Sequence, residues 1–545
     1  LLINQSTLLA GDGGDGGGPE GGAGGVGGSG VSITMSGGTL VNSHTINGGR
    51  GGNGGDIGGN GGAGGSGVSV NASALTPATL INTGTITGGN GGNKSPVCCD
   101  NGAGAVGVTF NNGTLINSGT IAGGLGGNSG PRADSIAFGT GVNLLELRLG
   151  SNIQATVNAN AGNNDLLILG GSGAATFDVG KIGSGQQYQG FEGFEKTGTS
   201  TWTLTGTQSG PTPWLIDQGT LSIAHDASLG AVSGNVTFSD GSLQNTASFT
   251  TARNFLMEGG SASFETLADL KITGAISGVG GGGLTKTGGA KLTLTGDNTY
   301  ISGTTILLGT LEIGDGGASG SIIGNVANSG TLAFNRSDNV IFDGAVSGSG
   351  ALVQLGAGLL TLTADNTYSG NTIVAAGSLE VGNGGTTGSI VGNVLNNGSL
   401  TFNRSDLLFY GGAISGNGGF AKAGAGMLIL TGDSSYTGDT IVDAGTLNVA
   451  GALGQTAVSV NNGATLTGSG SIGGPVTVQS GGTLSGVSDA SLSMGALTLN
   501  AGATTSILVN GPNVTLFNVA GNLTAAGTLN VDSGPRVPPG ADHAR

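Results

Sequence analysis

Three aspartates at a constant spacing are the first residues of this chain that could do chemistry. Asp297, Asp365 and Asp433 each follow Thr-Gly or Thr-Ala and precede Asn or Ser. Paired carboxylates are what glycoside hydrolases use as general acid and base. A catalytic residue has to be singular, whereas a turn residue is expected to recur in every copy of a repeat. We therefore interpret these aspartates as turn residues and assign no catalytic residue.

Two possible ion pairs recur in the same way. The phrase NRSD places Arg336 two residues before Asp338, and Arg404 two residues before Asp406. Recurrence again favours a structural role. We expect exposed ion pairs of little energetic weight.

The remaining polar candidates lack the spacing that metal or nucleophile chemistry needs. His44, His225 and His543 are far apart in the sequence and form no metal-ligand pattern. Ser29 lies in GGSGV without the strand-to-helix context of a nucleophile elbow. We therefore predict neither a zinc site nor a serine-protease site.

One glycine-rich stretch raises the question of calcium. GGNGGD at residues 51–56 matches the start of a nonapeptide that binds Ca²⁺ between turns of a β-roll, which makes Asp56 a candidate ligand. Asp12 and Asp15 lie in a similar run. The motif requires tandem copies and an apolar residue two positions after the aspartate, where this chain has Gly58. Such matches arise easily among glycines, so we assign no metal and no cofactor.

The two cysteines are adjacent, as Cys98 and Cys99 in NKSPVCCDNG. Neighbouring cysteines cannot join distant parts of the chain, so they provide no disulfide scaffold. We interpret them as loop residues. Two thiols and a vicinal disulfide are both compatible with the sequence.

The elements that must position these residues are short strands written in a repeat. The phrase GLTKTGGAKLTLTGDNTYISGTTILLGTLEIG at 283–314 returns in altered form at 351–382 and 419–450. Tyr300 and Tyr368 show the step, which is 68 residues (368 − 300). Apolar and polar residues alternate within each copy, which predicts strands with one buried face, and Gly-Asp or Asn-Gly pairs predict the turns.

A different repeat occupies residues 1–130. TLVNSHTINGG, TLINTGTITGG and TLINSGTIAGG follow a weaker first copy, and Asn4, Asn42, Asn82 and Asn117 hold the same place in each. We predict a ladder of asparagine amides that hydrogen-bond from coil to coil. Long glycine runs, such as residues 48–67, separate the copies, and we expect them to project as loops that are too costly in entropy to order without partners.

Strands this short cannot bury their apolar faces alone, so successive coils must stack on one another. We predict an all-β fold, a right-handed parallel β-helix with glycine-rich loops. Val460 and Val478 are 18 residues apart, about one coil, so a 68-residue copy should hold roughly three coils.

Composition excludes some classes of protein. The chain has 545 residues, with 15 Lys and Arg against 31 Asp and Glu, for a net charge of −16. A phosphate backbone would be repelled, so nucleic acid is excluded as a partner. No apolar run reaches the length of a membrane-spanning helix.

The phrase LTKTG…LTLTGDNTY with GTLEIG resembles the passenger-associated transport repeat of bacterial autotransporters. A divergent copy runs from Phe194 to Ala224, and its lead-in from Asp165 to Gly183 resembles a segment that often precedes the repeat. The resemblance implies a passenger at the surface of a Gram-negative bacterium or released from it. It also implies a signal peptide upstream and an outer-membrane β-barrel translocator, which this chain lacks.

We expect five regions along the chain: glycine-rich coils at 1–130, β-helix coils at 131–280 with the divergent repeat at 194–224, the 68-residue repeats at 281–450, C-terminal coils at 451–531, and a disordered tail at 532–545.

The function we expect is non-enzymatic, in adhesion to a receptor or polysaccharide on a host or neighbouring cell, or as a structural stalk. One alternative is a β-helical polysaccharide hydrolase or lyase, for which Glu265, Asp269 and Lys271 are the candidates outside the repeats. Another is a secretory module for a missing effector domain.

Threonine pairs suggest a further class, the flat ice-binding β-helices. Thr293/Thr295, Thr361/Thr363 and Thr465/Thr467 have the required pattern. Such a face needs the pair on successive coils, and the first two pairs are about three coils apart, so we disfavour this interpretation.

Overall fold

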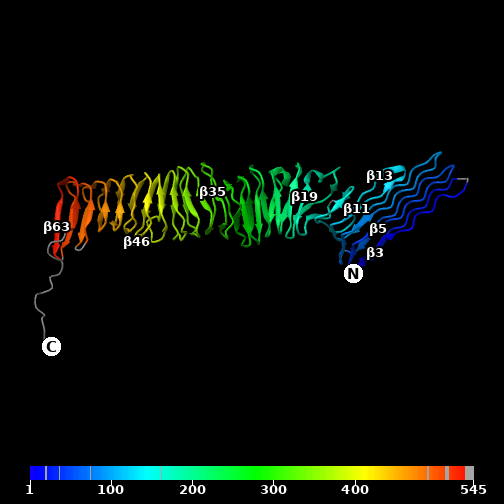
Figure 1. The fold of residues 1–545 in the computed structure, drawn as a ribbon, viewed down its shortest axis with the longest axis horizontal. Helices are drawn as coiled ribbons and strands as arrows, with labels where there is room; N and C mark the ends of the chain where they lie inside the picture. Colours follow the sequence, from blue (N-terminus) through cyan, green and yellow to red (C-terminus); the bar gives the residue numbers. More distant parts are fainter. Residues whose placement is uncertain are drawn as a thin grey trace, which may run out of the picture. The chain divides into compact units, whose positions relative to one another are not determined.

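The computed structural model describes residues 1–18, 21–35, 37–73, 75–160, 162–487, 490–509 and 515–533, so most of the expected tail lies outside the described residues. The chain forms two compact units, Leu1–Leu267 and Ala268–Arg545. Each unit is a parallel β-solenoid, which confirms the predicted all-β class (Figure 1). The right-handed sense stays a prediction. None of the helices in the described ranges has the length and apolar character needed to cross a membrane.

In unit 1 the strands of successive coils pair in parallel sheets. The first sheet contains β1 (Leu2–Asn4), β4 (Gly38–Asn42), β7 (Ala78–Asn82), β10 (Gly113–Asn117), β15 (Asn143–Leu147), β18 (Leu166–Leu169), β21 (Gly193–Lys196), β23 (Trp214–Ile216), β25 (Val236–Phe238) and β28 (Phe255–Glu258). A second sheet contains β2 (Leu8–Leu9), β5 (Thr45–Asn47), β8 (Thr85–Thr87), β11 (Thr120–Ala122) and β16 (Asn152–Ile153).

The other walls of unit 1 are built in the same way. A third sheet contains β3 (Val31–Met35), β6 (Val68–Ala72), β9 (Val108–Asn111), β14 (Ile136–Phe138), β17 (Val157–Asn158) and β20 (Tyr188–Gln189). A fourth contains β19 (Ala174–Asp178), β22 (Thr201–Thr205), β24 (Thr220–Ile223), β26 (Ser242–Asn245) and β29 (Ala262–Thr266). Short 3₁₀ turns interrupt the coils at η1 (Gly127–Ser129), η2 (Val179–Lys181) and η3 (Asp226–Leu229).

Unit 2 has the same parallel pairing of strands from coil to coil. One sheet contains β32 (Leu284–Thr287), β34 (Thr304–Ile306), β36 (Val326–Asn328) and β39 (Val346–Ser347). The next contains β30 (Leu270–Ile272), β33 (Lys291–Leu294), β35 (Thr310–Ile313), β37 (Thr331–Phe334), β40 (Ala351–Gln354), β42 (Thr372–Val374), β44 (Val394–Asn396) and β47 (Ile414–Ser415).

Three more sheets complete unit 2. The first of these sheets contains β38 (Val340–Phe342), β41 (Leu359–Leu362), β43 (Ser378–Val381), β45 (Ser399–Asn403), β48 (Gly419–Ala423), β50 (Thr440–Val442), β53 (Val458–Val460), β56 (Val476–Val478), β59 (Leu497–Leu499) and β62 (Leu523–Ala525). The second contains β46 (Leu408–Tyr410), β49 (Met427–Leu430), β51 (Thr446–Val449), β54 (Thr465–Gly468), β57 (Thr483–Val487), β60 (Thr504–Val509) and β63 (Thr528–Ser533). The last contains β52 (Ala452–Leu453), β55 (Ser471–Ile472), β58 (Leu492–Met494) and β61 (Phe517–Val519).

The alternation seen in the sequence sorts side chains between core and surface. In β7, Ala78, Leu80 and Asn82 point inward and are buried, whereas Thr79 and Ile81 are half-buried on the outer side. The predicted one-coil spacing of Val460 and Val478 is confirmed, because these residues are paired between β53 and β56. Each coil therefore adds apolar area to a shared core, the main source of stability in a solenoid.

The 68-residue repeat does not hold a whole number of coils. Leu294 pairs with Ile313, which pairs with Phe334, which pairs with Gln354, so three coils take 60 residues (354 − 294). The remaining residues of the period carry the chain on to the next wall. Accordingly β33 and its copies β41 and β49 lie in three different sheets. Equivalent residues of successive repeats therefore do not stack on one another.

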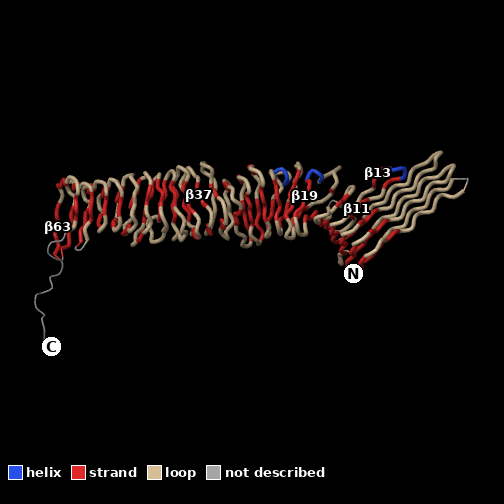
Figure 2. Tube along the Cα trace, viewed as in Figure 1, coloured by secondary structure: helices blue, strands red, loops and turns tan. Residues whose placement is uncertain are grey.

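The glycine runs form an ordered structure, which we call the glycine layer: residues 11–18, 21–30, 48–67, 88–107 and 123–134. Figure 2 shows these segments of unit 1 running side by side as loops that extend from the strands. Gly48, Gly51 and Gly54 donate their N–H groups to the carbonyl oxygens of the next segment, at 2.9, 2.8 and 2.8 Å. Gly49, Gly52 and Gly55 donate to the preceding one, at 2.8, 2.8 and 2.9 Å.

The third residue of each Gly-Gly-x triplet completes the hydrogen bonding. The backbone N–H of Arg50 donates to Asp12 Oδ1 at 2.7 Å, and that of Asn53 donates to Asp15 Oδ1 at 2.6 Å. Asn53 Oδ1 in turn accepts from the N–H of Asn93 at 2.9 Å. A period of three is that of the polyproline II helix. The sequence led us to expect that these runs need partners to order, and each segment has backbone partners in the neighbouring segments.

Candidate functional site

The repeated aspartates have structural surroundings, and two of them accept backbone hydrogen bonds with their carboxylates. Asp365 Oδ1 accepts from the N–H of Gly388 at 3.1 Å, and Asp433 Oδ1 from that of Ala452 at 3.1 Å. Asp297 forms a β-bridge with Ser321. Because the repeat is out of phase with the coil, the three aspartates do not converge on one site.

The NRSD arginines are not the exposed ion pairs expected from the sequence. Arg404 is only 8% exposed, although it does pair with Asp406 at 2.6 Å. It also donates to the carbonyl oxygens of Gly388 at 3.0 Å and Thr386 at 2.5 Å. Arg336 makes the same contacts with Asp338, Gly320 and Ala318. The guanidinium group needs a buried position because it supplies donors to carbonyl oxygens of the loop in the preceding coil.

The candidates for a hydrolase or lyase also have structural partners. Glu265 Oε2 accepts from Gln244 Nε2 at 2.9 Å in unit 1. In unit 2, Asp269 Oδ1 accepts from the N–H of Lys291 at 3.0 Å, and Lys271 pairs with Asp315 at 2.5 Å. The structure thus brings Lys271 to Asp315, a pairing with no signal in the sequence.

The histidines and Ser29 lie at separate surface positions. His44 is exposed, with Nδ1 at 3.2 Å from Ser43 Oγ, and His225 is exposed, with Nδ1 at 3.1 Å from Ser228 Oγ. Ser29 is an exposed third residue of the glycine layer. His543 lies outside the described residues.

We call each projecting segment of the glycine layer an arm. Asp56 is exposed at the end of the arm formed by residues 48–67. Nowhere in the described ranges do three His, Cys, Asp or Glu side chains form a group that could hold a metal ion. Cys98 and Cys99 are bonded to each other as a vicinal disulfide near the corresponding end of the next arm. Cys99 Sγ accepts from the N–H of Gly59 at 3.2 Å, which ties the two arms together.

The threonine pairs of the first two 68-residue copies do not form an exposed face, because Thr293 and Thr361 are each only 5% exposed. Thr465 and Thr467 in β54 differ. The flanking strands β51 and β57 place Thr446 and Thr483 in register with Thr465.

Sequence reasoning missed three buried lysines, which lie at equivalent places in the repeats. Lys196, Lys286 and Lys422 are each at most 2% exposed. Lys286 Nζ donates to the carbonyl oxygens of Thr287, Gly288 and Leu308 at 2.7, 2.8 and 3.0 Å. Burial lowers the pKa of each lysine to about 8, whereas the three oxygens around each ammonium favour its charged form. The available signal was a lysine at an inward position of the alternation, as in Leu284-Thr-Lys286-Thr.

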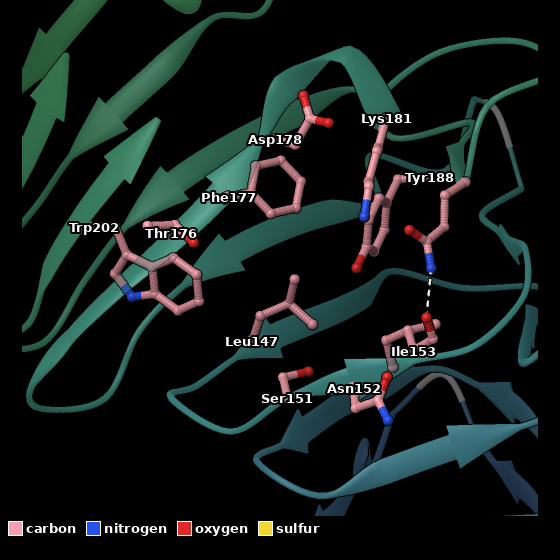
Figure 3. A pocket seen from close by; sticks show the side chains of 11 residues that line it. Leu147, Ser151, Asn152, Ile153, Thr176, Phe177, Asp178, Lys181, Tyr188 and Trp202 are labelled. Atoms are coloured by element: carbon pink, nitrogen blue, oxygen red, sulfur yellow. Dashed lines mark hydrogen bonds between the residues drawn. The ribbon is translucent and has the colours of Figure 1, made fainter. Parts of the chain in front are cut away.

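A cavity of about 170 Å³ opens in the wall of unit 1 (Figure 3). Its lining includes Leu147, Phe177 and Trp202, all buried, together with the polar residues Ser151 and Lys181. Tyr188 also lines it and is 6% exposed, and burial raises the pKa of its phenol. No pattern in the sequence indicates this cavity, because the cavity depends on where sheets begin and end.

Comparison with known proteins identifies the repeat. Residues 194–223, 284–313, 352–381 and 420–449 match the passenger-associated transport repeat, and they coincide with the four copies expected from the sequence. A stretch of 192 residues is 33% identical to the Adhesin BmaC autotransporter of Brucella suis biovar 1 (strain 1330). The four repeat matches and the adhesin relative together support an autotransporter passenger domain with repeats. The passenger is accordingly a bacterial protein that is exposed at the cell surface or secreted.

Two further relatives share parts of the passenger. A stretch of 68 residues, 12% of the chain, is 43% identical to the Extracellular serine protease of Serratia marcescens. Another of 170 residues, 27% of the chain, is 32% identical to the Uncharacterized protein YuaQ of Escherichia coli (strain K12). The aligned stretch with the adhesin is 35% of the passenger.

The passenger spans only a small part of these relatives, 6% of the adhesin, 6% of the protease and 12% of YuaQ. No solved structure matches the passenger. The passenger is thus similar over limited stretches to relatives with different names, an adhesin and a protease, so these likenesses alone do not specify an activity.

Proposed function

We propose that this passenger is a non-enzymatic adhesive rod displayed at the outer surface of a Gram-negative bacterium. Its partner would be a receptor or polysaccharide on a host or neighbouring cell. The observation that carries the proposal is the glycine layer, in which adjacent segments are joined by backbone hydrogen bonds while some third residues are exposed to solvent. Arg50 and Val26 are examples, and Val26 is 68% exposed.

The geometry of the layer suits contact with an extended partner. Adjacent segments lie within backbone hydrogen-bonding distance, so third residues from successive coils form rows on a continuous surface. Many weak contacts made together give high avidity without any single deep pocket. The name of the Brucella relative, an adhesin, is consistent with this role.

The same observations weigh against the hydrolase or lyase alternative. Asp365, Asp433, the NRSD arginines, Asp269 and Lys271 are each engaged by backbone groups or by ion pairs within the fold. A secretory module without binding activity of its own is the second candidate, and the match to a protease relative is the observation that favours it.

The test is an adhesion assay with beads that carry the whole chain. We expect the beads to bind epithelial cells or immobilised surface polysaccharide more than beads coated with an unrelated solenoid. Val26→Asp and Arg50→Glu, which change exposed third residues, should reduce binding at least several-fold. Phe409→Ser, at a 65% exposed site of unit 2, is the matched control and should leave it unchanged.

Binding that equals the unrelated solenoid would contradict the adhesive role and favour the secretory module. Binding that survives the two layer variants but falls in the control would place the adhesive surface in unit 2. Turnover of a polysaccharide panel by the chain would instead support the hydrolase or lyase.

A further inference from the structure

The cavity of Figure 3 exists because the walls of unit 1 change at this level. β16 is the last strand of its sheet and β20 is the last strand of another, while β19 is the first strand of a third. At such a changeover no strand of the next coil covers the end of the sheet. A hollow of about 170 Å³ is therefore left between β16, β19 and β20.

The polar group directed into the hollow has no partner. Tyr188 is only 6% exposed, and its hydroxyl makes no hydrogen bond to any part of the chain that the structure describes. Figure 3 shows this hydroxyl pointing toward the centre of the cavity. The other buried tyrosines are different, since Tyr300 bonds Thr304 Oγ1 at 2.8 Å and Tyr410 bonds the carbonyl oxygen of Gly392 at 2.8 Å. The Tyr188 hydroxyl is not one of the fully buried unpaired atoms of the described residues, so it is accessible from the cavity and can bond a ligand hydroxyl there.

The walls combine aromatic faces with a polar rim. Phe177 and Trp202 supply apolar ring surface, and Ser151, Asn152 and Lys181 supply hydroxyl, amide and ammonium groups at the edge. Lys181 is exposed and makes no ion pair within the described ranges, so its ammonium is available to a ligand. A ligand that fits must have one apolar face and several hydroxyl or carboxylate groups at its edge.

The cavity does not end at its rim. A shallower groove of about 500 Å³ adjoins it and shares Ile153, Lys181 and Gln187 as lining residues. Gln187 Nε2 donates to the carbonyl oxygen of Ile153 at 2.6 Å and marks the boundary between the two. The groove is otherwise lined by polar and small residues, namely Gln154, Ala155, Thr156, Gly185 and Gln186. A chain of polar units could therefore continue outward from one unit seated in the cavity.

We propose that this cavity binds the terminal pyranose ring of a glycan, with the following sugar units in the groove. The ring's apolar face would lie against Phe177 and Trp202. One ring hydroxyl would bond Tyr188, and the edge would face Ser151, Asn152 and Lys181. A peptide fits less well, because the closed end of the cavity accepts a single compact unit. This inference rests on the proposed adhesive function, to which it adds the chemical class of the partner.

The experiment is saturation-transfer NMR on the whole chain with a panel of methyl glycosides: glucose, galactose, N-acetylglucosamine, glucuronic acid and N-acetylneuraminic acid. We expect a saturable signal from at least one glycoside. Tyr188→Phe removes only the hydroxyl and should weaken binding at least ten-fold. Lys181→Gln, at an exposed rim position, provides a second variant that does not disturb packing and should weaken binding several-fold.

Tyr410→Phe is the matched control, because its hydroxyl bonds Gly392 far from the cavity lining in sequence and in unit 2. It should leave sugar binding unchanged. The absence of any saturable signal, or equal binding by the wild type, Tyr188→Phe and Lys181→Gln, would overturn the proposal.

The two proposals fail in distinguishable ways. If beads carrying the wild type and Tyr188→Phe adhere to cells equally while no glycoside binds, the adhesive function stands and the glycan site is wrong. If a glycoside binds and Tyr188→Phe abolishes that binding, but no surface retains the beads, the site stands and the adhesive function is wrong.

Discussion

The glycine-rich coils of unit 1 and the 68-residue repeats of unit 2 differ in how the length of the repeat relates to the length of a coil. In unit 1 each repeat is one coil with an insert of variable length, so equivalent residues stack. Asn4, Asn42, Asn82 and Asn117 form the predicted ladder, with Nδ2 to Oδ1 distances of 2.7 Å at each step. In unit 2 each repeat runs past the coil, so equivalent residues lie on different walls.

The consequence is a difference in how buried polar groups are satisfied. The asparagines of unit 1 bond one another, each copy depending on the next. In unit 2 the hydrogen-bond partner lies within the same copy of the repeat. The hydroxyl groups of Tyr300, Tyr368 and Tyr436 each bond the hydroxyl of the threonine four residues later, at 2.8, 2.5 and 2.7 Å. A repeat in sequence is therefore a repeat in contacts only where its length equals the coil.

The largest effect should come from adding a methyl group inside the glycine layer. A Cβ at Gly52 would overlap the carbonyl of Gly14, whereas a Cβ at Gly14 meets no atom within 4 Å. We expect Gly52→Ala to destabilise the layer by about 3 kcal/mol or more, since overpacking forces the backbone apart. Hydrogen exchange of the 48–67 arm should rise sharply in Gly52→Ala and stay unchanged in Gly14→Ala. Equal protection in the two variants would contradict the packing of the layer.

The asparagine ladder should show coupling that the unit 2 repeats lack. Asn82→Ala orphans the amide groups of Asn42 and Asn117, at a cost of about 1–3 kcal/mol for each buried group. A double-mutant cycle between Asn42 and Asn82, measured by denaturant unfolding, should give an interaction of about 0.5–3 kcal/mol. The cycle between Lys286 and Lys422, which lie on different walls, should be additive within about 0.5 kcal/mol. Additivity in the asparagine cycle would contradict the ladder.

The buried lysines can be tested against a substitution already present in the chain. Gln354 holds the lysine place in the middle repeat, and its Nε2 donates to the carbonyl oxygens of Gly356 and Gly358, at 3.0 Å each. Lys286→Gln should therefore retain stability within about 1 kcal/mol, whereas Lys286→Met leaves carbonyl oxygens unpaired and should cost about 1–3 kcal/mol. Thermal unfolding of the two variants decides this, and equal losses would show that the charge matters more than the hydrogen bonds.

Stability should also depend on alkaline pH, with two opposite slopes. The pKa of each buried lysine is lowered to about 8 in the folded chain, so between about pH 8 and 10.4 the unfolded chain binds more protons and stability should rise with pH. Tyr368 and Tyr436 have pKa values raised to about 12 by burial, so above about pH 10 the unfolded chain loses protons first and stability should fall.

Denaturant unfolding between pH 7 and 12 should therefore pass through a maximum near pH 10. Replacing Lys196, Lys286 and Lys422 by Gln should remove the rising limb and leave the falling one. A rising limb that persists in this triple variant would assign it to other groups.

Much of the fold could be predicted from the sequence because it is written in local signals. Alternation predicted the strands, and the recurrence of Asn82 in each copy predicted its ladder. The coil length followed from Val460 and Val478. The phase of the 68-residue repeat could not be predicted, because it depends on the residues consumed by each turn, which leave no periodic signal.

The candidate site was less accessible to sequence reasoning. The burial of Arg404 depends on a loop from the preceding coil, and the order of the glycine layer depends on partners about 38 to 40 residues away. The glycine content predicts that these segments lose much conformational entropy when they order. It does not predict the neighbouring segments whose hydrogen bonds offset that loss. The cavity beside Tyr188 follows from the ends of sheets, and no local pattern marks where a sheet ends.

The glycine layer also has a consequence for how this protein can change over generations. Two of every three positions in a triplet have no room for a side chain where the neighbouring carbonyl lies against them, as at Gly51 and Gly52. At the third position, Asp12, Asp15 and Asn53 accept backbone N–H groups of the next segment with their side chains. Other third residues, such as Arg50 and Val26, have exposed side chains that can change without loss of such a bond. Point mutations there alter the exposed face one residue at a time while the scaffold persists. We expect related strains to differ most at the codons for these exposed third residues. The bacterium can thereby change the chemistry of its surface with little effect on folding.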